Sequence, residues 1–306
     1  MIILILEYTI KKEDDSKLLK DILKNRLYIS TVLLKKLKSS KGILVNSVPT
    51  FVNYKVKQND KIIVNLESID DSKKFKDKFI LVDTPIDILY EDDYLLIINK
   101  PSNMPVHPSS DNYKNTLSNI VASYLEKQKI YNIHIITRLD KDTTGICIFA
   151  KNSYIQELFI RKKEQINLIK EYLAVCYGII PFEHKIIEEK IARKEGTIIL
   201  REVNNEGDYA KTEVFVTSTN KEKNFSTIKV ILHTGRTHQI RVHMSYIGYP
   251  LLGDDLYANN INDICKYITR QALHAHNISF YHPITNEYIN LTAKLPCDIE
   301  NLTLRD

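Results

Sequence analysis

The residues best suited to chemistry lie in one short polar loop, Thr137–Thr144. Asp140 is its candidate reactive side chain, and Arg138 stands two residues before it. The loop leads through Gly145 into Ile146–Ala150, a run that is apolar at every position, as in strands buried on both faces. A rigid strand at the base of a loop can hold a reactive carboxylate in a fixed position. The competing interpretation is that Asp140 is only a turn or cap residue.

A second polar stretch, residues 233–248, combines histidine, arginine, threonine and glutamine. Thr237 is the predicted N-cap of a helix, and Gly248 is its predicted end. Arg241 would then lie one helical turn from His238, on a different face from the apolar stripe. An arginine on such a face is most often a surface residue.

Length and charge indicate two domains, one with a sizeable core. The chain has 306 residues, with 43% hydrophobic and 26% charged residues, as is typical of globular proteins. Net charge is +5, but residues 11–61 contain 13 Lys/Arg against 5 Asp/Glu, a net +8, which leaves −3 for the remainder. Such a basic segment indicates a polyanionic partner, with a solvated lysine-rich face as the alternative.

Cysteine spacing and hydropathy exclude several classes of protein. The four cysteines are far apart with no Cys-x-x-Cys, so neither a disulfide framework nor a zinc site is predicted, and Cys147 and Cys176 are predicted to be buried thiols. Residues 1–6 are apolar but lack a basic flank and are too short to span a bilayer. We therefore expect a cytoplasmic protein without a membrane partner.

The basic N-terminal segment has its own pattern of helices and strands. Residues 16–28 place apolar side chains at helical spacing, and a second helix is predicted after Ser30 or Thr31. A strand is predicted at residues 43–45 and a strand pair within 56–66. Two short helices followed by small strands predict a compact basic unit.

This unit resembles the S4 RNA-binding domain. That family usually has Ser-Arg at the start of the second helix, then Gly-x-Val-x-Val-Asn-Gly and Gly-Asp; the corresponding residues are Ser30-Thr31, Gly42–Ser47 and Asn59-Asp60. One arginine and two glycines of the pattern are therefore replaced. The alternative is a small basic packing domain. The candidate RNA contacts implied by the resemblance are Arg26, Lys35, Lys36 and Lys38.

Residues 67–85 are polar and charged and end near Pro85, as in a linker. We predict an S4-like domain at 1–75, a linker at 76–85 and a second domain at 86–306. In the second domain a hairpin, a helix at 116–127 and several later strands follow without regular alternation of helix and strand, which indicates the α+β class.

The second domain resembles the RluA family of RNA pseudouridine synthases from Tyr90 to about Pro296. Six segments match in the order of the family. They are residues 89–101, 138–145, 170–174, 235–243, 250–254 and 273–276. One residue departs from the pattern, because Thr137 stands where the family usually has His before Arg-Leu-Asp. The departure bears on loop packing or substrate preference, since the aspartate carries the chemistry.

The resemblance implies an α+β fold with a long mixed, mostly antiparallel sheet, flanking helices and RNA in a central cleft. It also implies isomerisation of uridine to pseudouridine in structured RNA, with 23S ribosomal RNA as the expected substrate and tRNA as the alternative. This reaction breaks the N-glycosidic bond, turns the base and rejoins it through C5. A carboxylate can attack the sugar or base, or abstract a proton from the sugar. No metal or other cofactor is implied, and a monomer is expected.

The resemblance assigns a role to each matching residue. Asp140 would be the catalytic carboxylate, with Asp142 as its rival, and Arg241 would pair with it and orient it. Tyr172 would stack on the target base and take part in proton transfer, while Arg138 would fill the space of the flipped base. The implied substrate-binding residues are Arg138, Leu139, Thr143, Gly145, His238 and Gln239.

Two other functions are compatible with parts of the sequence. A non-catalytic RNA-binding or assembly factor on the same fold would be expected to lack Asp140 or Arg241, and both are present. A metal-dependent hydrolase would need a ligand pattern such as His-Glu-x-x-His, which is absent. Its candidate ligands would be His238, His243, His274 and His276.

Overall fold

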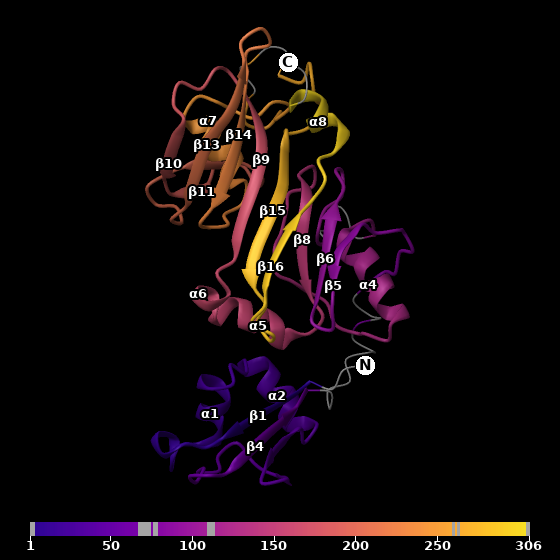
Figure 1. The fold of residues 1–306 in the computed structure, drawn as a ribbon, viewed down its shortest axis with the longest axis vertical. Coiled ribbons are helices and arrows are strands. Elements are labelled where there is room, and N and C mark those ends of the chain that lie inside the picture. Colours follow the sequence, from indigo (N-terminus) through magenta and orange to yellow (C-terminus); the bar gives the residue numbers. More distant parts are fainter. Residues whose placement is uncertain are drawn as a thin grey trace.

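The computed structural model describes residues 4–66, 75, 79–108, 114–258, 261 and 264–303. A small N-terminal unit (indigo in Figure 1) lies beyond one end of a long sheet. This sheet and the helices around it form the rest of the described molecule. In the described part of the chain no helix is long and apolar enough to cross a membrane.

The N-terminal unit is a four-stranded antiparallel sheet, in the order β1-β4-β2-β3, with two short helices. Its elements are β1 (Ile5–Thr9), the 3-10 turn η1 (Lys12–Asp14), α1 (Leu19–Asn25), α2 (Thr31–Ser39), β2 (Ile43–Val45), β3 (Val48–Pro49) and β4 (Lys61–Asn65). The Ser30 side chain accepts a hydrogen bond from the Leu33 N–H, which confirms it as the cap of α2.

The predicted strand pair within residues 56–66 is wrong, because that stretch contains only β4. Before β4, the Asp60 carboxylate accepts hydrogen bonds from the Lys57 N–H and the Tyr54 hydroxyl, which folds this segment into a loop. Val56 is hydrogen-bonded through its backbone to Ser16 and Lys17 instead. The second partner of β4 is β1, from the apolar N-terminal residues.

Within the described residues the large sheet has ten strands, and it is mostly antiparallel, as predicted. Its order is β10-β13-β14-β9-β15-β8-β6-β5, with β16 on β15 and β7 on β8, and its one parallel pair among the described residues is β8 with β15. The strands are β5 (Ile88–Glu91), β6 (Leu95–Lys100), β7 (His134–Ile135), β8 (Thr144–Ala150), β9 (Ile169–Tyr177), β10 (His184–Glu188), β13 (Lys211–Asn220), β14 (Phe225–Leu232), β15 (Leu273–Tyr281) and β16 (Tyr288–Thr292).

Strand β8 is buried along its whole length, which confirms the interpretation of its apolar run. One face of β6 and β8 packs against α4 (Leu117–Lys127), and the other packs against α5 (Ser153–Arg161). The side chains facing α4 are Leu96, Ile98, Cys147 and Phe149, and those facing α5 are Leu95, Ile97, Ile146 and Ile148. Each fully buried aliphatic side chain stabilises the fold by about 1.5–3 kcal/mol, so the loop before β8 has a firm base.

The remaining elements of the described part pack around the sheet. They are α6 (Lys163–Ile166), the hairpin β11 (Ile191–Arg193) and β12 (Arg201–Val203), α7 (Gln239–Tyr246) and α8 (Cys297–Thr303). Helices α5 and α6 lie at the end nearest the N-terminal unit (Figure 1). There the Lys162 ammonium lies 5.2 Å from the ring centre of Tyr28.

Part of the segment predicted as a linker is packed, although residues 80, 81 and 83–85 are exposed. Phe75 and Phe79 are buried in one cluster with Leu96, and the Ile80 carbonyl accepts a hydrogen bond from the Asn119 side chain. The predicted boundary at residue 75 therefore lies too far along the chain, because Phe75 packs with the second domain. Residues 67–74 and 76–78 lie outside the described part.

Candidate active site

Helix α7 begins in a different way from the prediction. Its N-cap is His238, in the left-handed conformation with φ +57°, and Thr237 does not cap it. The first turn is held instead by the Gln239 side chain, which accepts hydrogen bonds from the Arg236 N–H and the Thr234 hydroxyl. The buried amide of Gln239 also donates to the Lys211 carbonyl, so its polar atoms are all occupied within the protein.

Arg241 is buried, contrary to the usual position of a helix arginine. Its Nε and Nη2 each lie 2.7 Å from a carboxylate oxygen of Asp254, and its Nη1 lies 3.3 Å from Oδ2 of Asp140. Burial alone would lower the pKa of Arg241, but the hydrogen bonds and charge of Asp254, together with Asp140, raise it. The guanidinium is therefore a permanent cation with one nitrogen directed at Asp140.

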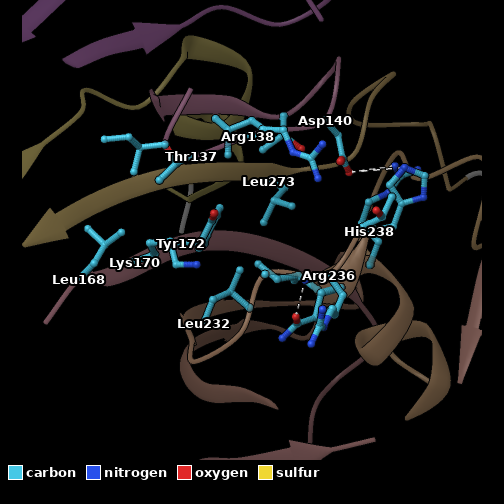
Figure 2. Close-up of a pocket in the computed structure, with 18 of the residues that line it drawn as sticks. Thr137, Arg138, Asp140, Leu168, Lys170, Tyr172, Leu232, Arg236, His238 and Leu273 are labelled. Carbon is cyan, nitrogen blue, oxygen red and sulfur yellow. Dashed lines mark hydrogen bonds and ion pairs between the residues drawn. The ribbon is translucent and has the colours of Figure 1, made fainter. Parts of the chain in front are cut away.

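Asp140 is at the junction of the polar loop and α7. Its Oδ2 faces Nη1 of Arg241 at 3.3 Å and Nε2 of His238 at 3.9 Å, and its side chain is 27% exposed (Figure 2). The structure thus brings together the carboxylate, the arginine and the histidine that the two sequence segments supply. A carboxylate held beside the Arg241 cation and still open to solvent can act on a ligand in the adjoining cavity.

A buried lysine, Lys100, anchors the loop that carries Asp140. The Lys100 ammonium donates to the carbonyls of Pro101, Met104 and Lys141, at 2.7, 2.9 and 2.8 Å. Lys141 follows Asp140 directly, so this anchor fixes the backbone next to the carboxylate. Burial lowers the pKa of Lys100 to about 8.

A cavity of about 510 Å³ adjoins Asp140, large enough for a nucleotide. The 136–140 loop, the end of β14 and the segment before α7 line it together with β9, which supplies Tyr172 (Figure 2). Tyr172 is 7% exposed, and its burial raises the pKa of the phenol. Lys170 lies two residues earlier on the same face of β9, and its burial lowers the pKa of the ammonium.

The other predicted substrate-binding residues divide into two groups. Arg138, Leu139, Thr143 and Gln239 line the cavity, and Arg138 is exposed there. The buried hydroxyl of Thr143 accepts a hydrogen bond from Gln271. Gly145 is outside the lining, because it pairs with Ala275 across the β8–β15 junction.

The four candidate RNA contacts of the N-terminal unit have different surroundings. Arg26 is committed to an internal ion pair, with three hydrogen bonds to Asp14 and one to Glu13. Lys35, Lys36 and Lys38 lie on α2, where Lys35 and Lys38 are exposed. Arg26 is thus less available to a ligand than these two lysines.

The histidines proposed for a hydrolase do not converge. No group of three or more His, Cys, Asp or Glu side chains suited to a metal ion occurs within the described ranges. His243 bonds to the Thr212 hydroxyl and the Glu189 carbonyl, while His274 bonds to Thr144. The structure therefore offers no geometric support for the hydrolase.

Sequence reasoning missed two residues that surround Arg241. Asp254 lies in the matching segment 250–254, to which the sequence analysis assigned no side-chain partner, and it is the buried counter-charge of Arg241. Tyr257 places its ring 5.1 Å from the Arg241 guanidinium and its hydroxyl 2.7 Å from His238. No short pattern in the sequence marks this tyrosine.

Comparison with known proteins assigns the fold and the family. The family described as RNA pseudouridylate synthase matches residues 94–246, half of the chain. The chain belongs to the RNA pseudouridine synthases. An uncharacterized RNA pseudouridine synthase of Bacillus subtilis, YhcT, is 34% identical and covers 97% of this chain and 96% of its own length.

Two further relatives extend this assignment. Ribosomal large subunit pseudouridine synthase D of Buchnera aphidicola is 36% identical, covering 93% of each chain. The solved structure of human RNA Pseudouridylate Synthase Domain Containing 1 has the same fold, with a TM-score of 0.56 at 23% identity, covering 69% of this chain and 84% of that one. The sequence prediction of an RluA-type pseudouridine synthase with an α+β fold is confirmed. The protein isomerises uridine to pseudouridine in RNA.

Proposed function

We propose that Asp140 is the catalytic carboxylate of this pseudouridine synthase and that Arg241 orients it. The observation that carries the proposal is the 3.3 Å approach of Arg241 Nη1 to Asp140 Oδ2 at the wall of a nucleotide-sized cavity. Because Asp254 occupies the other nitrogens of Arg241, the guanidinium cannot rotate away from Asp140. Oδ1 of Asp140 has no protein partner among the described residues and is free to act on the substrate.

The chemistry needs little beyond this carboxylate. The N1–C1′ bond breaks, the base turns, a C5–C1′ bond forms, the C5 proton leaves and N1 takes up a proton. Asp140 can act by attack on the sugar or base, or by removing a proton from the sugar. Tyr172 lines the cavity and offers a face for stacking of the base, and its hydroxyl is a candidate to pass the C5 proton.

RNA must deliver the uridine unstacked, which costs a few kcal/mol. Arg138 is exposed at the cavity and makes no ion pair within the described residues, so it can fill the place of the flipped base. Lys170 likewise has no carboxylate partner there. Two unpaired cations at one cavity favour a polyanionic substrate such as RNA.

We infer that the substrate is large-subunit ribosomal RNA. The inference is supported by relatives named ribosomal large subunit pseudouridine synthase D, with transfer RNA as the alternative. The N-terminal unit would add affinity as an S4-like RNA-binding domain through Lys35 and Lys38 on α2. The protein would act in the cytoplasm as a monomer.

The test is release of tritium from [5-³H]uridine-labelled ribosomal and transfer RNA. Native protein should release tritium and Asp140→Asn should not, whereas Asp142→Asn, two residues away in the same loop, should retain activity. Release by Asp140→Asn would move the catalytic role to another residue. Release from transfer RNA alone would overturn the ribosomal assignment.

A further inference from the structure

The His238 side chain is held between the proposed catalytic carboxylate and a tyrosine. Its Nδ1 lies 2.7 Å from the hydroxyl of Tyr257, and its Nε2 lies 3.9 Å from Oδ2 of Asp140. The backbone of His238 is left-handed, with φ +57°, a conformation that costs a non-glycine residue about 1–2 kcal/mol. A strained residue at a functional site indicates that the position of its side chain matters.

The hydrogen bonds of Tyr257 favour one tautomer of His238. The Tyr257 oxygen accepts a hydrogen bond from the backbone N–H of Arg201, at 3.0 Å. Its own O–H has one acceptor among the described residues, Nδ1 of His238. With Nδ1 accepting, the neutral imidazole must carry its proton on Nε2, the nitrogen that faces Asp140.

Tyr257 itself is fixed from several sides. Its backbone carbonyl accepts a hydrogen bond from the Ser245 hydroxyl, and its backbone N–H donates to Asp254 at 3.3 Å. Its ring lies over the Arg241 guanidinium. The Arg201 side chain donates to three carbonyls of its own hairpin, so the N–H that Tyr257 accepts is also held in place.

We propose that Tyr257 is a positioning residue for the isomerisation: it holds His238 as the neutral Nε2–H tautomer, which directs a donor at Asp140. The inference rests on the proposed role of Asp140. Burial and the neighbouring Arg241 cation lower the pKa of His238 against the opposing pull of Asp140, which also favours a neutral ring. A neutral donor supports the carboxylate without adding a second full charge beside Arg241.

The experiment compares Tyr257→Phe, which removes only the hydroxyl, with Tyr246→Phe, which removes an exposed hydroxyl on α7 away from the cavity. Turnover is measured by tritium release from [5-³H]uridine-labelled large-subunit ribosomal RNA. Losing one neutral hydrogen bond should lower the kcat of Tyr257→Phe about fivefold, with KM nearly unchanged. Tyr246→Phe should match the native protein.

The tautomer is read independently from the nitrogen spectrum of protein labelled with ¹⁵N-histidine, with the His238 signals assigned by their loss in His238→Gln. Native protein should show the proton on Nε2, and Tyr257→Phe should show a mixture of tautomers. A proton on Nδ1 in the native protein, or an unchanged kcat in Tyr257→Phe, would overturn the inference. In the His238→Gln background Tyr257→Phe should have no further effect on kcat, because the two residues act as a unit.

Failure of the proposed function gives a different result. In that case Asp140→Asn still releases tritium, whereas the nitrogen spectrum of the native protein decides the tautomer of His238 independently.

Discussion

Arg241 gives two of its nitrogens to Asp254, each at 2.7 Å, and only one to Asp140, at 3.3 Å. Asp254 is fully buried, whereas Asp140 is partly open to the cavity. The buried pair is therefore the structural support, and the weaker contact is the one a substrate can compete with. This division separates a buried aspartate that supports the fold from the aspartate that we propose as the catalytic residue.

Replacement of Asp254 should therefore cost more stability than replacement of Asp140. Asp254→Asn leaves the buried Arg241 cation without its counter-charge, and breaking a buried pair in this way costs about 3–5 kcal/mol. Asp140→Asn should change the free energy of unfolding by much less, because its side chain is 27% exposed. Urea unfolding of both variants measures the difference; equal losses would contradict the division of roles.

The buried Lys100 should make stability depend on pH. Burial lowers its pKa to about 8 in the folded protein, against roughly 10.4 for an unfolded chain. Between these values the unfolded chain binds the extra proton, so Lys100 makes the free energy of unfolding rise with pH, by at most about 1.4 kcal/mol per pH unit. Below pH 8 both states are protonated, and the contribution is constant.

Lys100→Met should remove this rise. Urea unfolding at pH 7.5, 8.5 and 9.5 should show a difference between native and variant protein that changes with pH. The matched control is Lys20→Met, at an exposed position, which should leave the pH dependence unchanged. A native–variant difference that is constant over this window would show that Lys100 keeps its ordinary pKa.

Gly145 is required by space as well as by backbone conformation. A Cβ there would lie 2.2 Å from the Ala275 carbonyl oxygen, at a φ of +106°. Gly196 also has a positive φ, +74°, but nothing lies within 4 Å of its Cβ position. Gly196→Ala should cost about 1–2 kcal/mol from backbone strain alone, and Gly145→Ala more than about 3 kcal/mol. Thermal unfolding measures the stability of both variants. Similar losses of stability would mean that β8 and β15 can move apart at little cost in free energy.

Local pattern was enough to predict β8, which carries the loop of the site, and the start of α2 in the N-terminal unit. The apolar run of β8 and the Ser30 cap of α2 follow from spacing and residue type, and the structure confirms both. The start of α7 did not follow, because Thr237 has the right side chain for a cap but Gln239, through long-range hydrogen bonds to β13, holds the turn instead. Propensity cannot anticipate such tertiary contacts.

The candidate site was predictable where a family pattern names the residue, as for Asp140 and Arg241. Asp254 and Tyr257 become evident only when the chain brings them to Arg241. The contacts of Phe79 and Ile80 were also hidden, because the charged residues that precede them are typical of a linker, while the burial of Phe79 and the hydrogen bond from Asn119 on α4 to the Ile80 carbonyl are tertiary contacts.

Thr137 stands where the family usually has histidine, and its structural role gives a test. Its buried Oγ1 accepts a hydrogen bond from the Ile148 N–H at 2.9 Å, across the β8 backbone. Thr137→Val keeps the shape but leaves that N–H unsatisfied, which should cost about 1–3 kcal/mol. Thr137→Ser retains the hydroxyl and should cost less. Urea unfolding measures the free energy of unfolding of each variant. If the valine variant is as stable as the native protein, this hydrogen bond does not stabilise the loop.

The exposed lysines of α2 should contribute to RNA affinity by binding phosphates. Removal of one lysine–phosphate interaction lowers the steepness of log K against log salt concentration by about 0.7–0.9. The double variant Lys35→Gln/Lys38→Gln should therefore lower this slope by up to about 1.8 and weaken binding to ribosomal RNA. The control is Lys11→Gln with Lys20→Gln, two exposed lysines outside α2. Filter binding from 50 to 300 mM salt measures both slopes. Because catalysis belongs to the other domain, kcat at saturating RNA should stay unchanged. An unaltered slope would contradict the RNA-binding role of α2, because its lysines would then face solvent rather than RNA. The N-terminal unit would in that case be a packing domain.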